Sequence, residues 1–235
     1  MGDVACTTAE LDALTAFDTP TMCNALERLE PGLQAGGYTT RSFVCGFPQQ
    51  KPVVGYARTA TIRSAEPLSL ALAKQTALLH DYYRYVDAGP RPSVVVIQEL
   101  DDPAGCGAFW GEVQSAIHVG LGARALLTNG SVRDLDQWAP GFQFLAGRIS
   151  ASHAYARPVS VGGEVEVFGL HVRTGDLLHA DRHGAVIVPP ALVRALPDAA
   201  REIASRESSI LKVARGPGCT AEKLIEVFRS LDAIH

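Results

Sequence analysis

Residues 128–138 read TNGSVRDLDQW and contain an adjacent arginine and aspartate, Arg133 and Asp134. An apolar run comes before them, followed by Asn129-Gly130, a pair that is typical of a turn. A guanidinium can bind a carboxylate through two parallel hydrogen bonds, and an aspartate oxygen suits a hard divalent cation. The residues alone leave two interpretations open. The pair could be the solvated start of a helix, or half of a site that binds an anion and a metal ion together.

A glycine-rich segment, DDPAGCGAFWGE at 101–112, leads into a predicted helix that begins near Gly111. The first N–H groups of a helix have no partner within it, and the helix dipole favours an anion beside them. The chain contains neither G-x-x-x-x-G-K-[ST] nor G-x-G-x-x-G, so a small carboxylate is the expected guest rather than a nucleotide phosphate. Arg133 would reach that carboxylate from the next loop, and Asp134 would remain available to a cation.

The segments around these loops predict a strand, a helix and a second strand. SVVVIQEL at 93–100 is a short apolar run suited to a strand buried on both faces. GEVQSAIHVGLG at 111–122 repeats apolar residues at helical spacing, and ARALLT at 123–128 is the next strand. This order predicts a βαβ unit, whose parallel strands end at the same edge of the sheet. Both candidate loops would therefore lie together.

The rest of the chain fits the same α/β class and shows no linker or internal repeat. Two short amphipathic helices, broken near Pro20, precede a strand at 55–62 and a helix at 67–85. The last 40 residues are predicted to form helices. Further strands are expected at 142–151, 163–178 and 185–189. We predict a single domain over residues 1–235 with an antiparallel, β-rich portion.

Composition narrows the possible classes of function. Apolar residues make up 47% of the 235 residues and charged residues 20%, which is ordinary for a globular protein. A net charge of −4 gives no electrostatic reason to expect a nucleic-acid partner, and no apolar run approaches the roughly 20 residues of a membrane helix. Five cysteines without a C-x-x-C motif predict reduced thiols rather than disulfides or a zinc site. Without a secretory signal pattern, we expect a cytoplasmic protein.

The run from Gly111 to Asp134, GEVQSAIHVGLGARALLTNGSVRD, resembles the signature of the RraA-like family. That signature opens a helix with G-[DE] and closes with G-x-V-x-D-G-x-x-R-D. The similarity continues in VRTGDLLHADRHGAVIVP at 172–189, FDTPTMCNAL at 17–26 and GYARTATI at 55–62. It therefore covers most of the chain.

Three residues depart from the family pattern. Asn129 stands where the family has Asp before glycine, Thr174 replaces Pro, and Asn24 replaces Asp. Asparagine tolerates the left-handed conformation of a tight turn, so we expect the turn at Asn129-Gly130 to be preserved. None of the three removes a group that the family's chemistry requires, although Asn129 could alter a hydrogen bond behind the site.

The resemblance implies a fold and an assembly. The expected fold is a single α/β/β/α sandwich of the swivelling β/β/α type, followed by C-terminal helices. Members of the family form homotrimers, sometimes stacked into hexamers, with their sites at the subunit boundaries. The family includes class II 4-hydroxy-4-methyl-2-oxoglutarate/4-carboxy-4-hydroxy-2-oxoadipate aldolases, which cleave a 4-hydroxy-2-oxo acid to pyruvate. The resemblance thus implies a carbon–carbon lyase that also decarboxylates oxaloacetate.

The aldolases' site residues can be carried onto matching positions. Asp134 would hold Mg²⁺ or Mn²⁺ largely through waters, Arg133 would bind the pyruvyl group, and Glu112 would anchor a metal-bound water. Backbone amides at the start of the helix would complete the substrate site, from Gly111, Glu112, Val113 and Gln114. A glutamate from the adjacent subunit's C-terminal helix would complete the metal shell, with Glu207 as the first choice and Glu202 as the second.

Some family members instead regulate an RNA-degrading enzyme by binding it, and this is the alternative function. Such a regulator need not retain Glu112, Asp134 and a C-terminal glutamate, so their presence favours an enzyme. The histidines have simpler interpretations. His118 is expected to be a packed or interface residue. His153, at a strand end, is a possible contact to substrate.

Overall fold

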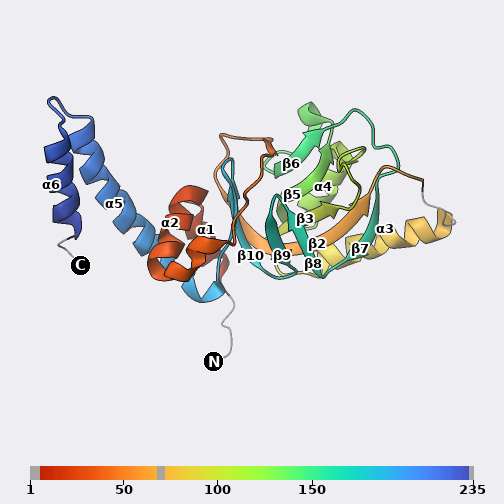
Figure 1. Ribbon diagram of the computed structural model, residues 1–235. Helices are drawn as coiled ribbons and strands as arrows, with labels where there is room; N and C mark the ends of the chain where they lie inside the picture. The colour runs from red at the N-terminus through yellow and green to blue at the C-terminus, as the bar shows by residue number, and fades with distance from the viewer. Residues whose placement is uncertain (1–5, 68–71, 233–235) are drawn as a thin grey trace.

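The computed structural model describes residues 6–67 and 72–232. At its centre, parallel strands lie side by side in a curled sheet (Figure 1). These strands are β2 (Val53–Arg63), β3 (Ser93–Glu99), β5 (Ala123–Val132) and β6 (Gln143–Ile149). β3 pairs in parallel with both β2 and β5, and β5 pairs in parallel with β6. The predicted βαβ unit is confirmed.

Shorter strands extend this sheet on both sides of the parallel centre. They are β1 (Val44–Cys45), β4 (Ala108–Trp110), β7 (Arg157–Val161), β10 (Leu177–Asp181) and β11 (Gly184–Ile187). β4 pairs in parallel with the end of β5, whereas β7 and β10 pair antiparallel with β2. Within the described ranges these nine strands make one sheet, and β8 (Glu164–Val167) and β9 (Leu170–Arg173) form a separate hairpin.

The two faces of the sheet are covered differently. Helices α3 (Leu72–Asp87) and α4 (Glu112–Gly120) lie on one face, where Tyr82, Trp110 and Phe142 are fully buried. The β8–β9 hairpin covers the other face with alternating apolar side chains that include Val165 and Val172. Burial of both faces explains why β3 is an almost continuous apolar run. This is the α/β class expected from the sequence.

The terminal helices form a third packed region beside β10 and β11. It contains α1 (Thr8–Leu14), α2 (Thr19–Leu29) and the first turns of α5 (Leu196–Ala214). α5 then runs away from the sheet and carries α6 (Ala221–Asp232) at its far end (Figure 1). Short 3₁₀ turns complete the described elements, at Pro31–Ala35, Leu135–Gln137 and Pro190–Leu192.

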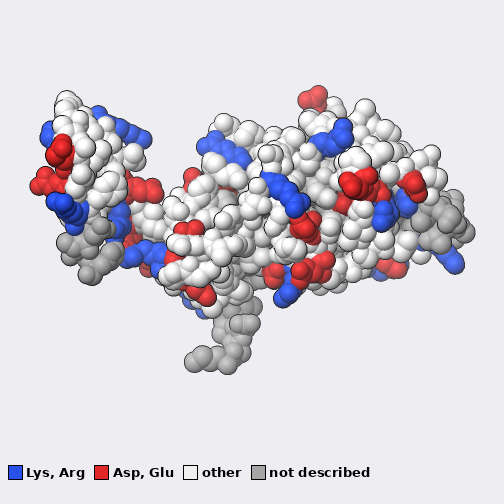
Figure 2. Space-filling model, in the orientation of Figure 1, with Lys and Arg blue, Asp and Glu red and all other residues white. Residues whose placement is uncertain are grey.

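Acidic and basic side chains are interspersed over the face shown in Figure 2, both on the sheet region and on α5 and α6. Among the helices of the described chain, none has the length and apolar content needed to cross a bilayer.

Two predictions about strands are wrong in detail. The strand expected to end at Thr128 continues to Val132, so Asn129-Gly130 is not a turn, and neither residue has positive φ. The strand expected over 163–178 is instead the β8–β9 hairpin followed by β10. Phe168 and Gly169 make that hairpin's turn, with φ of 55° and 82°. The helix expected over 67–85 is α3. Pro67 is not helical, and the predicted residues 68–71 lie outside the described part.

Candidate active site

Pairing of β4 with β5 brings the two candidate loops together. Ala108 lies opposite Ser131 and Trp110 opposite Val132 in this parallel pair. The N–H of Arg133 then donates to the carbonyl of Trp110 over 2.9 Å. The residues that follow β4 begin α4, and those that follow β5 are Arg133 and Asp134. The start of α4 and the Arg-Asp pair are therefore held side by side.

Asp134 lies directly against the start of α4. Its Oδ2 accepts the N–H of Glu112 at 3.3 Å and lies 3.4 Å from Nε of Arg133. A Cβ at Gly111 would collide with the same carboxylate oxygen, so only glycine permits this approach. Asp134 adopts the left-handed conformation, with φ of 55°, which aspartate tolerates better than most residues. The Arg133 and Asp134 side chains are 36% and 37% exposed, so a ligand can reach both.

The first turn of α4 offers hydrogen-bond donors at this point. Gly111 is the N-cap and provides no side-chain cap. The N–H groups of Val113 and Gln114 belong to the first turn of the helix, where no carbonyl within the helix can accept from them. Glu112 is exposed in the same turn. An anion placed here would meet free donors, the positive end of the helix dipole and the guanidinium of Arg133.

The expected third carboxylate is not near this point within one chain. Glu207 lies exposed on α5, which packs against α2 and α6. Glu202, the second choice, is bound to Arg28 at 2.7 Å. Within residues 6–67 and 72–232, no group of three or more His, Cys, Asp or Glu residues could hold a metal ion. A complete shell of the predicted type would require α5 from another copy of the chain.

Glu99, at the end of β3, connects the two segments that carry the site. The amide of Asn129 accepts the N–H of Glu99 at 2.7 Å and donates to its carbonyl at 3.0 Å. The carboxylate of Glu99 accepts the hydroxyl of Ser64, which itself accepts the N–H of Gly107 at 2.8 Å. The second carboxylate oxygen is buried without a partner among the described residues, 2.5 Å from where a Cβ at Gly130 would stand. Burial raises the pKa of Glu99.

Sequence reasoning missed this network because its members are far apart in the chain. The local pattern Asn129-Gly130 predicts a turn, and it indicates only that Asn129 could make a hydrogen bond behind the site. Asn129 instead continues the pairing of β3 and β5 with its side chain, beyond the last backbone pair at Ile97 and Thr128. Gly130 is required because a side chain there would displace the carboxylate of Glu99.

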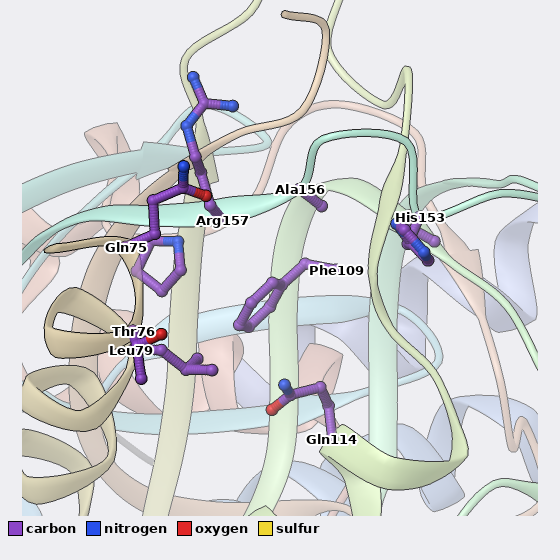
Figure 3. Close-up of a pocket in the computed structure, with 10 residues that line it drawn as sticks. Gln75, Thr76, Leu79, Phe109, Gln114, His153, Ala156 and Arg157 are labelled. Atoms are coloured by element: carbon purple, nitrogen blue, oxygen red, sulfur yellow. The ribbon is translucent and has the colours of Figure 1, made fainter. Parts of the chain in front are cut away.

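A cavity of about 320 Å³ lies on the α3 side of the start of α4 (Figure 3). The lining comes from α3, from β4 and from the segment 153–158 that leads into β7. Its lining residues are Gln75, Thr76, Leu79, Ala108, Phe109, Gln114, His153, Ala156, Arg157 and Pro158. Gln114 thus faces both regions, because its backbone lies in the first turn of α4 and its side chain lines the cavity.

The histidines differ in their surroundings. His118 is buried, with Nε2 2.6 Å from the hydroxyl of Tyr82 and Nδ1 2.6 Å from the carbonyl of Gln114. Burial lowers the pKa of His118 to about 4, so it is a neutral, packed residue at pH 7. His153 is exposed at the edge of the cavity. His179 is buried, with Nδ1 3.0 Å from the hydroxyl of Thr19.

Comparison with known proteins defines the class to which this fold and site belong. The family model described as RraA-like, Aldolase/RraA, matches residues 19–187. The chain therefore belongs to the RraA-like family. This family includes aldolases and decarboxylases as well as RNase inhibitors. A comparison with curated proteins gave no match.

Solved structures share the fold over much or nearly all of the chain. An uncharacterised protein from Pseudomonas syringae pv. tomato has a TM-score of 0.69 at 20% identity, covering 96% of this chain and 97% of its own. Streptomyces coelicolor RraAS2, described as an unusual member of the RNase ES inhibitor RraA family, has a TM-score of 0.66 at 20% identity, with 87% and 96% covered. The RNA-processing inhibitor RraA from Thermus thermophilus has a TM-score of 0.52 at 18% identity, with 71% and 92% covered. At these identities the likeness shows a shared fold.

Proposed function

We propose that this protein is a divalent-metal-dependent pyruvate aldolase of the cytoplasm. It would cleave a 4-hydroxy-2-oxo acid to pyruvate and a second oxo compound, with oxaloacetate decarboxylation as a side activity. The observation that carries the proposal is the contact of Asp134 with the first turn of α4, beside Arg133. A carboxylate, a guanidinium and helix N–H donors surround one exposed point, which suits a 2-oxo acid bound with a hard cation.

The residues around this point have distinct roles. The N–H groups of Val113 and Gln114 hold the substrate carboxylate at the start of α4. Arg133 faces the 2-oxo oxygen and stabilises the negative charge that develops there as the carbon–carbon bond breaks. Glu112 holds a water that carries protons to and from the reacting groups.

Asp134 is the residue that would hold Mg²⁺ or Mn²⁺. Its Oδ2 is occupied by the Glu112 N–H and Arg133, and in the described structure no hydrogen bond reaches Oδ1. The donor set fits, because Mg²⁺ binds through one or two carboxylates and keeps several waters. When bound, the cation would supply Lewis-acid stabilisation of the enolate. Glu207 from an adjacent subunit of a homotrimer or hexamer would complete the shell, with Glu202 as the alternative.

The first test is pyruvate release from a panel of 4-hydroxy-2-oxo acids and oxaloacetate. We expect EDTA to abolish release and Mg²⁺ or Mn²⁺ to restore it. Arg133→Ala should lower kcat by about 10² to 10³, the cost of removing one oxyanion donor. Arg133→Lys should lie between that variant and the natural protein, because lysine keeps the charge without the planar fork.

Two outcomes would contradict the proposal. Full activity in metal-free buffer would exclude the class II mechanism. No pyruvate from any substrate with either metal, together with binding to an RNA-degrading enzyme, would favour the regulator. Circular dichroism of the Arg133 variants controls for folding.

A further inference from the structure

We propose that the cavity beside α4 binds the part of the substrate beyond its 2-oxo acid end, and that this part is an apolar, ring-sized group that carries a hydrogen-bond donor. This inference rests on the proposed function and adds a class of substrate to it.

The cavity and the 2-oxo acid site share one wall, formed by residues 109–114. Asp134 contacts this wall from the β5 side, at the N–H of Glu112. On the α3 side, Phe109 packs edge-on against Tyr82 at 5.9 Å, and Gln114 donates to the hydroxyl of Tyr83 at 2.9 Å. One turn of helix rises only about 5.4 Å. A substrate with its carboxylate at the first N–H groups of α4 can therefore extend across this turn into the cavity.

The middle of the cavity is apolar. In Figure 3 the ring of Phe109 lies at its centre, with Leu79 of α3 facing it. Ala108, Ala156 and Pro158 add small or apolar surface to the lining. A volume of about 320 Å³ leaves room for an aromatic ring. Transfer of such a group from water to this lining is favourable, because it removes apolar surface from water.

The guanidinium at the edge is held by the protein through Nη1, and its Nε is buried with no partner among the described residues. Arg157 is the sole Lys or Arg among the described residues that line the cavity. Its Nη1 donates to the carbonyls of Tyr155 at 2.9 Å and Glu66 at 2.5 Å. In Figure 3 its guanidinium points away from Phe109. A carboxylate placed in the middle of the cavity would lose its hydration without gaining this cation.

Gln114 supplies the polar contact. Its Nε2 is bound to Tyr83, whereas its Oε1 is buried and has no partner within the described structure. A buried acceptor without a donor is unfavourable, so a ligand with an O–H at this position would satisfy it. A hydroxyl on the ring provides that donor.

The reaction predicted for such a substrate is balanced without a further reactant. In 4-hydroxy-2-oxo-4-(hydroxyphenyl)butanoate, the C3–C4 bond breaks and its electron pair stays on C3. The 4-hydroxyl loses its proton and becomes the aldehyde oxygen. C3 takes up one proton, giving pyruvate and hydroxybenzaldehyde.

The experiment compares four substrates that differ only at C4, which carries methyl, carboxylate, phenyl or 4-hydroxyphenyl. We expect kcat/KM for phenyl to exceed that for methyl and carboxylate by about tenfold or more. The 4-hydroxyphenyl substrate should gain up to about another tenfold, and Gln114→Leu should remove that gain. Ala156→Phe should fill the cavity and remove the preference for phenyl while the methyl substrate is cleaved within about twofold of normal. Val159→Phe, which adds the same ring at an exposed position of β7, is the control.

A binding measurement separates failure of this inference from failure of the proposed function. Saturation-transfer NMR with 4-hydroxybenzaldehyde should detect binding that Ala156→Phe abolishes and Val159→Phe retains. Equal cleavage of all four substrates, unchanged in Ala156→Phe, would overturn the inference but would still support the proposed aldolase function. If no substrate is cleaved, the binding result decides whether the cavity takes such a ring.

Discussion

Replacing Asn129 with aspartate tests how β3 and β5 are joined beneath the site. The natural side chain accepts the N–H of Glu99 at 2.7 Å and donates to its carbonyl at 3.0 Å. Aspartate keeps the first bond and cannot make the second, so the carbonyl of Glu99 loses its donor. The introduced carboxylate would also lie near the carboxylate of Glu99, whose pKa is already raised by burial. Asn129→Asp restores the residue of the family pattern and should nevertheless destabilise this chain.

The expected loss is about 1–3 kcal/mol in the free energy of unfolding at pH 7, the cost of leaving a partly buried polar group unpaired. The assay is urea unfolding followed by the fluorescence of Trp110 and Trp138, both buried. Repulsion between the carboxylates adds to the loss at neutral pH. It should weaken as the pH falls and Glu99, whose pKa is raised by burial, takes up a proton. Asn24→Asp is the matched control, because it also restores a family residue and lies exposed on α2. An Asn129→Asp protein as stable as the natural one would refute the reasoning.

Three further predictions concern the site and its supports. Gly111→Ala should lower kcat/KM for pyruvate release at least about tenfold, because the added Cβ displaces Asp134, whereas Gly120→Ala, with nothing within 4 Å of its added Cβ, should have little effect. Because the pKa of Glu99 is raised in the folded state, the natural protein should lose stability as the pH rises and Glu99 ionises. Glu99→Gln cannot ionise, so its free energy of unfolding should increase relative to that of the natural protein between pH 4 and pH 8, as measured by urea unfolding. Asp134→Ala and Glu207→Ala proteins, each inactive, should regain partial pyruvate release when mixed and reassembled, and no recovery would argue against a shared site.

The parallel centre of the fold could be predicted from local sequence. β3 is buried on both faces and its sequence is an almost continuous apolar run, and α4 follows the expected glycine. These features depend on short-range periodicity and on helix ends, which a single sequence carries directly. The closeness of Gly111 and Asp134 followed from the rule that parallel strands end at one edge.

The hairpin at β8 and β9 was missed because its turn has an unusual residue. Two-residue hairpin turns favour Asn or Asp followed by glycine, which accept positive φ at low cost. Here Phe168 takes that conformation, and its side chain is buried in the core beneath the hairpin, next to Phe43 at 5.5 Å. Packing of the aromatic ring compensates for the local strain. Because Phe43 and Phe168 are far apart in the sequence, local patterns do not predict this contact.

The cavity could not have been predicted for a similar reason. Leu79, Phe109 and Pro158 come from three separate stretches of the chain. Their meeting depends on the pairing of β7 with the end of β2 and on the position of α3 beside it. No motif signals that geometry, so the specificity proposed for the site came only from the structure.

Asn129-Gly130 shows most clearly how a local preference was overridden. The dipeptide favours a turn, yet β5 continues through it for two further residues. The register between β5 and β6 shifts in this stretch, and Glu99 fills the space that a larger residue at 130 would need. This continuation allows β5 to pair with β4 and carries Arg133 to the carbonyl of Trp110. Had the chain turned at Asn129, the Arg-Asp pair would have left the sheet before reaching the start of α4. The side chain of Asn129, which predicted a turn, thus helps to align the start of α4 with the Arg-Asp pair.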